Sequence, residues 1–320
     1  MASAPGSPPA PFGRVLTAMV TPFTDDGELD IAAAQRLATH LVDNGHDGLV
    51  VSGTTGESAT TDDEEQLELL AAVLEAVGER AAVVAGVGTN DTQHTVDKAR
   101  AAAELGAHGL LVVTPYYTKP PQAGLLAHFR TAADATGLPV MLYDIPGRTG
   151  TAIATETLVR AAEHPRIVAV KDAKGDLYET SWVMARCNLS YYSGDDAANL
   201  ALLAHGATGV VSVVGHVAGR EYAAMVRAVL GGDLPEAQRI HRQLLPAVRA
   251  IMTRTQGAIM AKAALQAHGV LTSRAMRAPL VEATTDEIAL LVADLVEARL
   301  MDADRLAVDI TDVDLLETRS

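Results

Sequence analysis

The run Gly109-Leu110-Leu111-Val112-Val113 decides the fold, because it is apolar at every position. A strand with no polar face is covered on both sides, which is typical of a parallel sheet flanked by helices. On either side of this run, short apolar or β-branched segments alternate with segments of helical period that are rich in Ala, Leu and Glu. This alternation predicts βα units and a parallel α/β protein.

Eight segments in all have the character of buried strands, and a helical pattern follows each of them. They cover residues 15–20, 48–51, 82–87, 109–113, 139–143, 167–171, 190–193 and 209–213. Eight βα units in one chain predict a TIM (β/α)8 barrel. An open doubly wound sheet is the structural alternative, because the number of strands does not by itself prove closure.

Past the eighth unit, three helical patterns follow, at residues 234–254, 257–268 and 285–299. They predict a small C-terminal helical appendage over residues 233–300, after a barrel over residues 12–232.

The two ends of the 320-residue chain differ from the rest. Residues 1–11 are rich in Ala, Pro, Ser and Gly and have no periodicity, so we expect a disordered arm. Residues 301–320 form an acidic tail, in which the apolar residues are too scattered to predict a packed element.

Composition disfavours several classes of function. The formal net charge of -15 argues against nucleic acid or an anionic membrane as a partner, because phosphate contacts need clustered Lys and Arg. Neither a signal peptide nor an apolar run of about 18 residues is found, so we expect a cytoplasmic protein. Cys187 is the only cysteine, which excludes cysteine zinc and iron–sulfur sites. No metal-ligand spacing or nucleotide-binding fingerprint is complete, so we expect neither a metal nor a bound nucleotide.

The sixth predicted strand, residues 167–171, ends in a lysine. Strand alternation places Ile167, Ala169 and Lys171 on one face, which is the interior of a closed barrel. Active sites of this fold lie at the carboxyl ends of the strands, where loss of water favours a neutral amine that can attack a carbonyl. The structural alternative is a strand-end lysine in solvent, which is what we expect of Lys174 in the next loop.

The fifth predicted strand ends in Tyr143, on the same face as Pro139 and Met141. A phenol near Lys171 can pass protons between covalent intermediates and solvent. Its structural alternative is a core tyrosine with a satisfied hydroxyl. The turn that follows presents Arg148, whose guanidinium can bind a carboxylate through two hydrogen bonds or form a surface salt bridge.

Two further loops at strand ends carry hydroxyl groups. After the second strand, residues 53–57 read Gly-Thr-Thr-Gly-Glu, so that glycines let the backbone approach a ligand while Thr54 and Thr55 offer hydroxyls and amides to a carboxylate. After the fourth strand, Tyr116 and Tyr117 are adjacent, although either alone would usually have a packing role.

Reactive groups therefore follow strands two, four, five and six, at the end of a barrel where enzymes of this fold work. This coincidence favours one active site over four unrelated structural roles. After strand seven, residues 193–196 read Ser-Gly-Asp-Asp and include Gly194. They either shape the pocket or cap the next helix, and we favour capping.

In the order and approximate spacing of these motifs, the chain resembles the dihydrodipicolinate synthase and N-acetylneuraminate lyase family of class I aldolases, over residues 12–299. The resemblance implies that Lys171 forms a Schiff base with pyruvate and that Tyr143 relays protons. It also implies that Thr55 hydrogen-bonds the relay and binds the carboxylate of pyruvate, with Thr54 beside it.

The same resemblance implies a homotetramer of tight dimers, in which Tyr117 completes the relay from a neighbouring subunit. Arg148 would hold the carboxylate of the second substrate. Val211, through its carbonyl, and Gly194 would line the pocket. The threonine pair and the arginine together resemble the synthase branch more than the sialic-acid lyases.

The reaction that the resemblance implies joins pyruvate to L-aspartate 4-semialdehyde, without a cofactor, in diaminopimelate and lysine synthesis. A pyruvate lyase for a sugar acid is the alternative within the class, since only the acceptor pocket would differ. A barrel that binds a keto acid without turnover is the alternative from another class.

The resemblance finally implies an effector site for L-lysine at the tight-dimer interface. The positions that match sensitive relatives are Ser58, Ala59, Asn90 and Tyr116. His94 occupies the place of a glutamate that would receive the effector's ammonium group, so we expect weak inhibition. Asp63 lies nearby in this pattern and would partly offset the loss of that negative charge.

Overall fold

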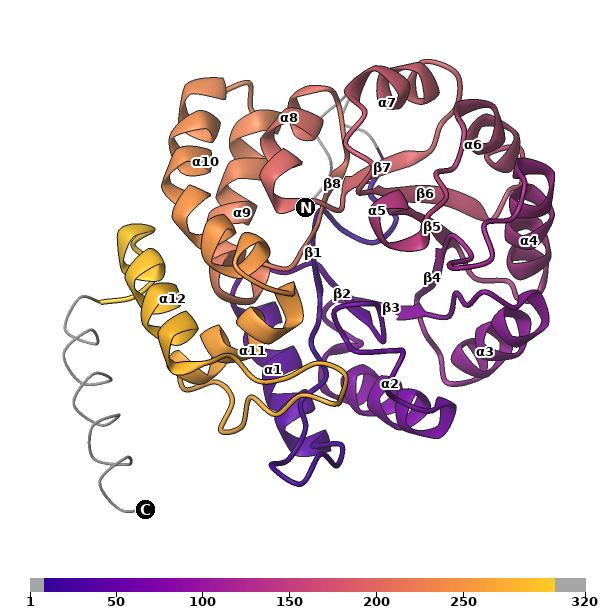
Figure 1. Ribbon diagram of the computed structural model, residues 1–320. Helices are drawn as coiled ribbons and strands as arrows, with labels where there is room; N and C mark the ends of the chain where they lie inside the picture. The colour runs from indigo at the N-terminus through magenta and orange to yellow at the C-terminus, as the bar shows by residue number, and fades with distance from the viewer. Residues whose placement is uncertain (1–8, 303–320) are drawn as a thin grey trace.

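The computed structural model describes residues 9–302, and within them eight parallel strands close into a barrel (Figure 1). Strand β1 pairs with β8 as well as with β2, so the open doubly wound alternative is wrong and the TIM-barrel prediction is confirmed. The strands are β1 (Val15–Ala18), β2 (Gly48–Val51), β3 (Ala82–Gly86), β4 (Gly109–Val113), β5 (Val140–Asp144), β6 (Ile167–Asp172), β7 (Ser190–Ser193) and β8 (Gly209–Ser212).

Helices form a ring around the strands, and at least one helix follows each strand. The helices of the ring are α1 (Ile31–Asp43), α2 (Asp63–Val77), α3 (Thr92–Glu104), α4 (Gln122–Asp134), α5 (Pro146–Thr149), α6 (Thr155–Ala161), α7 (Leu177–Met184), α8 (Asn199–Ala204) and α9 (Gly215–Leu230). A short 3-10 helix, η1 (Asp196–Ala198), precedes α8. The ring covers the outer face of the sheet, as the all-apolar strands require.

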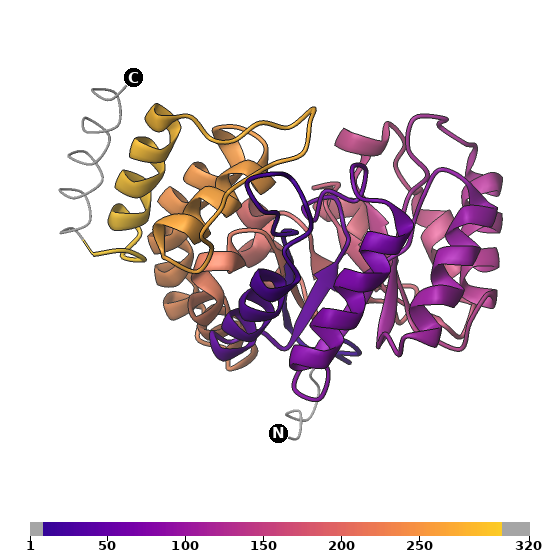
Figure 2. The same cartoon turned by 90° about the horizontal axis from the view of Figure 1, so that it is seen from below.

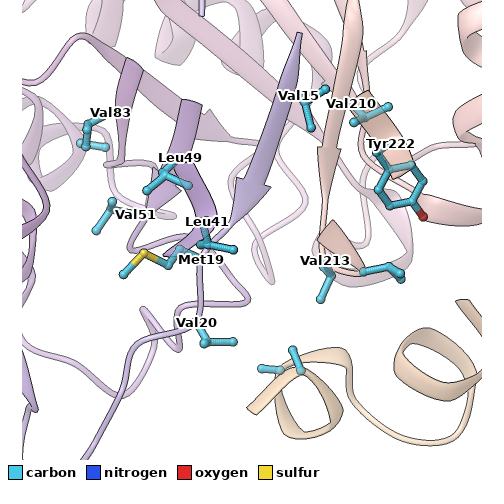
Figure 3. Packing of buried hydrophobic residues seen from close by; sticks show 14 of the residues in the cluster. Val15, Met19, Val20, Leu41, Leu49, Val51, Val83, Val210, Val213 and Tyr222 are labelled. Carbon is cyan, nitrogen blue, oxygen red and sulfur yellow. The ribbon is translucent and has the colours of Figure 1, made fainter. Parts of the chain in front are cut away.

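Alternation along the strands separates an inner core from an outer one. On β2, the side chain of Val50 belongs to the inner core, whereas Leu49 and Val51 belong to the outer core between sheet and helices. Figure 3 shows the outer core at β1, β2 and β8, with Leu41 of α1 close to Leu49. A side chain's position in its strand therefore decides whether it faces the barrel interior.

Phe12 fills the N-terminal end of the inner core. Its ring lies where a side chain on Gly109 would stand, since a Cβ there would come within 2.3 Å of the ring. The glycine that begins β4 is thus required by the close approach of Phe12. Phe12 therefore occupies the barrel interior at the end where the strands begin, opposite the end where active sites of this fold lie.

A β-bulge interrupts the alternation at the start of β6. Val140 pairs with Ile167, but the next residue, Met141, pairs with Ala169, so Val168 has no partner on β5. Ile167 therefore belongs to the outer core, and its predicted place on the face of Lys171 is wrong. From Ala169 onward the predicted alternation holds, because the bulge lies before the functional part of the strand.

The remaining helices form the predicted appendage on one side of the barrel, next to α9 (Figure 1). They are α10 (Leu234–Val248), the π-helical turn η2 (Arg249–Thr253), α11 (Gly257–Ala267) and α12 (Thr285–Glu297). In Figure 2 the loop between α11 and α12 lies at the same end of the barrel as α5. The appendage thus reaches the end of the barrel at which the strands terminate.

The predicted acidic tail lies outside the described residues except at Met301 and Asp302, and most of the predicted arm lies outside them too. Within residues 9–11 of that arm, the carbonyl oxygen of Pro9 accepts hydrogen bonds from the hydroxyls of Ser190 and Thr208.

Candidate active site

Strands β5 and β6 bring Tyr143 and Lys171 together at the C-terminal end of the barrel. The two residues are partners in the parallel register, and the Nζ atom of Lys171 lies 4.1 Å from the centroid of the Tyr143 ring. Lys171 is 4% exposed and Tyr143 is 5% exposed. Lys171 is therefore not a strand-end lysine in solvent, and the two side chains form a contact pair inside the barrel.

Burial lowers the pKa of Lys171 to about 8. The carboxylate of Asp196 opposes this shift, and the guanidinium of Arg148 adds to it. A lysine in water is almost wholly protonated at neutral pH, whereas here a usable fraction of the amine is neutral. Only the neutral amine has the lone pair that attacks a carbonyl carbon.

Gly194, in the loop after β7, leaves the space that the Lys171 side chain occupies. A Cβ at position 194 would lie 2.8 Å from the Cγ and 2.9 Å from the Cε of the lysine. Any side chain there would displace the lysine stem. The next residue, Asp195, accepts a hydrogen bond from the backbone N–H of Ala197 and caps η1, as predicted for this segment.

Asp196 has a further role that sequence reasoning missed. Its carboxylate is buried, and it accepts hydrogen bonds from the backbone N–H groups of Val213 and Val214, at 2.9 and 3.0 Å, and from the hydroxyl of Ser212. It thus joins the end of β7 to the end of β8. The only sign of this role in the sequence is that two aspartates follow each other, although Asp195 alone is sufficient to cap η1.

Arg148 approaches the contact pair from the one-turn helix α5. Burial raises the pKa of Tyr143 well above its usual value, while the positive charge of Arg148 opposes the rise. The exposed guanidinium is therefore within electrostatic reach of both Tyr143 and Lys171. The phenol stays protonated at neutral pH, so it can donate a hydrogen bond to a bound oxygen.

Thr54 and Thr55 lie in a tight turn after β2, at the same end of the barrel. The backbone N–H of Gly56 donates to the carbonyl oxygen of Gly53 at 3.0 Å, and that of Glu57 donates to the carbonyl oxygen of Thr54 at 3.2 Å. Thr54 is exposed and Thr55 is partly buried. The two hydroxyls are thus presented on a short, hydrogen-bonded loop, as predicted.

Tyr116 and Tyr117 are 41% and 86% exposed, so neither is the packing residue that was the alternative. Tyr117 has a φ of 71°, a left-handed conformation that is uncommon for a residue with a side chain. Its backbone N–H donates to the carbonyl oxygen of Thr149 at 3.3 Å, which holds the loop against α5. A strained and exposed tyrosine of this kind is typical of a functional position.

Val211 and Lys174 are both largely buried, in different parts of the barrel. Val211 of β8 is buried in the inner core together with Tyr143. Lys174 is not the solvated lysine that we expected, because its side chain is 11% exposed and its Nζ donates to Glu179 at 2.5 Å. It also lies 3.9 Å from Asp144, so acidic residues behind β5 and β6 draw this lysine inward.

The predicted effector residues lie in the loops after β2, β3 and β4 and at the start of α3. Ala59 and Asn90 are exposed, and Ser58 is partly buried. The imidazole of His94 lies 2.8 Å from a carboxylate oxygen of Asp63, whose other oxygen accepts from a lysine of α3 at 3.1 Å.

The part of the chain that the structure describes holds no group of three or more His, Cys, Asp or Glu side chains arranged to bind a metal ion. None of its helices is long and apolar enough to cross a membrane.

Comparison with known proteins identifies the family. The sequence model of the dihydrodipicolinate synthetase family matches residues 11–298. The chain belongs to this family. A curated relative from Kineococcus radiotolerans, named 4-hydroxy-tetrahydrodipicolinate synthase, is 69% identical over 296 residues, which cover 92% of this chain and 96% of the relative.

Solved structures of the family have the same fold. The structure of DHDPS from Cyanidioschyzon merolae with lysine bound has a TM-score of 0.89 at 42% identity, and the match covers 92% of this chain and 100% of that one. The enzyme from Acinetobacter baumannii, complexed with pyruvate, has a TM-score of 0.87 at 31% identity, with 91% and 100% covered.

Proposed function

We propose that this protein is a lyase that condenses pyruvate with L-aspartate 4-semialdehyde to form 4-hydroxy-tetrahydrodipicolinate, in lysine and diaminopimelate synthesis. The observation that carries the proposal is Lys171, a buried amine with a lowered pKa against Tyr143 at the C-terminal end of the barrel. The relative that is 69% identical to this chain bears the name of this activity. We place the reaction in the cytoplasm.

In the first half of the reaction, the neutral Nζ of Lys171 attacks the keto carbon of pyruvate and forms a carbinolamine. Loss of water gives a protonated Schiff base, which draws electrons from the neighbouring methyl group. Release of one methyl proton then gives an enamine. No external oxidant or reductant is needed, because each step moves only protons and electron pairs within the adduct.

In the second half, the enamine carbon attacks the aldehyde carbon of the semialdehyde and forms the new carbon–carbon bond. The amino group of the second substrate then attacks the Schiff-base carbon, closes the ring and releases Lys171 as a free amine. The enzyme returns to its starting state with no residue modified.

Tyr143 is positioned to move the protons that these steps require. Its buried phenol keeps its proton at neutral pH, so it can donate to the oxygen that leaves as water. The Nζ atom of Lys171, on which the adduct forms, lies 4.1 Å from the centroid of the same ring. We assign Thr55 as the hydrogen-bond partner of the phenol and Tyr117 as the link to solvent, as the family resemblance implies.

Two threonines and one arginine can bind the carboxylates of the two substrates. We assign Thr54 and Thr55 to the carboxylate of pyruvate, because hydroxyls and amides on a short turn suit it. Arg148 binds the carboxylate of the semialdehyde, since its guanidinium is exposed at the mouth of the barrel and within electrostatic reach of Lys171. Gly194 and the carbonyl of Val211 line the pocket.

We further propose a homotetramer of tight dimers in which Tyr117 acts in the neighbouring subunit. Its side chain is 86% exposed on a strained loop, so it contributes little to the packing of its own chain. A mixed dimer of Lys171→Ala and Tyr117→Phe chains should regain activity, because one of its two sites has both groups. Absence of rescue, or an active monomeric wild type in sedimentation, would reject the shared site.

The experiment that tests the function is turnover of pyruvate and L-aspartate 4-semialdehyde, followed through a coupled nicotinamide-dependent reductase. Wild type should consume the reduced nicotinamide, and Lys171→Ala should not. Release of pyruvate from a 2-keto-3-deoxy sugar acid, without the coupled reaction, would support the sugar-acid lyase instead. Saturable binding of pyruvate with neither reaction would support the non-catalytic barrel.

A further inference from the structure

The turn that carries Thr54 and Thr55 is bound at its end to the C-terminal appendage. Glu57, the last residue of the turn, is buried, and its side chain points toward α11. One carboxylate oxygen lies 2.6 Å from the Nζ of Lys262, and both side chains are 1% exposed. These two residues are 205 positions apart in the chain.

Every polar group of this pair has a partner. The second oxygen of Glu57 accepts from the backbone N–H of Arg277 at 3.1 Å. Lys262 also donates to the carbonyl oxygen of Ala275 at 2.7 Å, and its Nζ lies 4.2 Å from the centroid of the Phe23 ring. A buried charge pair with complete partners fixes the relative position of the elements that carry it.

The turn itself needs such a fixed point. Glu57 has a φ of 55°, a left-handed conformation that a residue with a side chain rarely adopts. The carbonyl oxygen of Gly56 accepts from the hydroxyl of Thr21 at 2.6 Å, which holds the turn from the side of β1. Without Lys262, one carboxylate oxygen of Glu57 would be buried without its partner, so we expect the turn to shift.

We propose that Lys262 is a positioning residue for substrate binding, which acts through Glu57 to hold Thr54 and Thr55 against the barrel mouth. The C-terminal appendage is in this way a part of the active site. The proposal rests on the proposed function, because it takes pyruvate as the ligand of the turn. It also gives a reason why a chain would keep a fully buried ion pair, which by itself adds little to stability.

The test is steady-state kinetics of Lys262→Met, with Arg254→Met as the matched control. Arg254 pairs with the buried carboxylate of Asp294 inside the same appendage, and Asp294 keeps Arg249 as a second partner. Lys262→Met should raise the KM for pyruvate about tenfold or more. The KM for the semialdehyde, which Arg148 binds, should change by less than about twofold.

A second variant covers the case in which the orphaned glutamate prevents folding. The double substitution Glu57→Gln with Lys262→Met removes both charges of the pair. It should raise the KM for pyruvate as Lys262→Met alone does. Conversely, if either folded variant has the pyruvate KM of Arg254→Met, the positioning role is refuted.

Borohydride trapping separates the two proposals. In wild type, pyruvate should be trapped on Lys171. The variants should reach the same final extent of labelling, but a higher pyruvate concentration should be needed for half of it. Failure of wild type to trap pyruvate would overturn the proposed function and the positioning role with it. Normal trapping in wild type with unchanged half-saturation in the variants would overturn the positioning role alone.

Discussion

The two faces of strands β5 and β6 place lysines in opposite surroundings. On the inner face, Lys171 lies beside the ring of Tyr143, its partner in the register. One residue further along each strand, Asp144 and Asp172 are also partners, but they face the helices outside the barrel. There Lys174 is enclosed by carboxylates, with Glu179 at 2.5 Å and Asp144 at 3.9 Å.

Burial alone therefore does not make a lysine reactive. The side chains of Lys174 and Lys262 are both largely buried, yet each Nζ atom lies within hydrogen-bond distance of a carboxylate. Burial lowers the pKa of Lys262, and the carboxylate of Glu57 opposes this shift. Lys171 lies against an aromatic ring and, among the described residues, has no carboxylate at hydrogen-bond distance. The carboxylate that acts on its pKa, Asp196, accepts hydrogen bonds from the backbone just after β8. A lysine becomes a nucleophile where water is excluded and its counter-charge is engaged elsewhere.

The largest expected effect concerns which lysine forms the covalent adduct. Borohydride with pyruvate should label Lys171 and leave Lys174 unlabelled, which peptide mass mapping will show. Lys171→Ala should abolish trapping and lower kcat on the order of a thousandfold or more, because the nucleophile itself is removed. Lys174→Ala is the matched control and should still be trapped. A label on Lys174, or an unlabelled wild type, would contradict the comparison of the two faces.

Removal of the phenol of Tyr143 should have the next largest effect. Tyr143→Phe keeps the ring over Lys171 and removes only the proton donor, so kcat should fall on the order of a hundred- to a thousandfold. The fold should be retained, since the inner-core contacts of the ring are unchanged. Circular dichroism and steady-state rates measure both quantities. A rate close to wild type would show that another group moves the protons.

The pH dependence of trapping tests the lowered pKa of Lys171 directly. With a pKa of about 8, the neutral fraction of the amine rises about tenfold per pH unit below that value and levels off above it. The initial rate of trapping at low pyruvate concentration should follow the same curve. If the rate continued to rise up to pH 10, the amine would have the pKa of an ordinary lysine.

Much of this site could be predicted from sequence because its information is local. Alternation along the strands places Tyr143 and Lys171 on the inner face, and the order of strands places them at one end of the barrel. The bulge at Val168 does not follow from alternation, since nothing in an apolar run indicates which residue lacks a partner. Its effect ends before Lys171, so the predicted place of Lys171 on the inner face is confirmed, although that of Ile167 is wrong.

Contacts between distant segments could not be predicted in the same way. The sequence predicts a solvated Lys174, because it lies in a loop with Gly175 and Asp176. Only the folded arrangement brings Asp144 to it. The pair of Glu57 and Lys262 joins two segments that no periodicity connects. These contacts depend on the distance between side chains in space, which a single sequence does not give.

The same comparison predicts a cost in stability for the reactive lysine. Because the folded pKa of Lys171 is about 8 and its usual value is 10.5, the folded state resists protonation, and the cost is fully present below pH 8. Lys171→Met should therefore be more stable than wild type at pH 7, by on the order of 3 kcal/mol. The difference should shrink as pH rises from 8 to 10.5. Denaturant unfolding at pH 7 and pH 10 measures it, and a less stable variant at pH 7 would contradict the desolvation argument.

The smallest expected effect concerns inhibition by L-lysine. It depends on Asp63, a carboxylate that already has hydrogen-bond partners. The family pattern predicts that Asp63 partly replaces the negative charge that His94 does not supply. In the structure, partial burial tends to raise the pKa of Asp63, but hydrogen bonds from His94 and Lys98 outweigh it and lower the pKa. Both oxygens are engaged, so little of this charge is available to an incoming ammonium group.

We therefore expect weak inhibition, if any, by L-lysine. Loss of a hydrogen bond to a charged group costs about 1.5–3 kcal/mol, which weakens binding about ten- to a hundredfold. Initial rates at fixed substrate concentrations, measured against lysine, test this, and half-inhibition below about 1 mM would show that another group receives the ammonium. His94→Glu should increase sensitivity, because it supplies an anion and releases one oxygen of Asp63. If His94→Glu leaves the inhibition curve unchanged, the position of residue 94 does not determine the response to lysine.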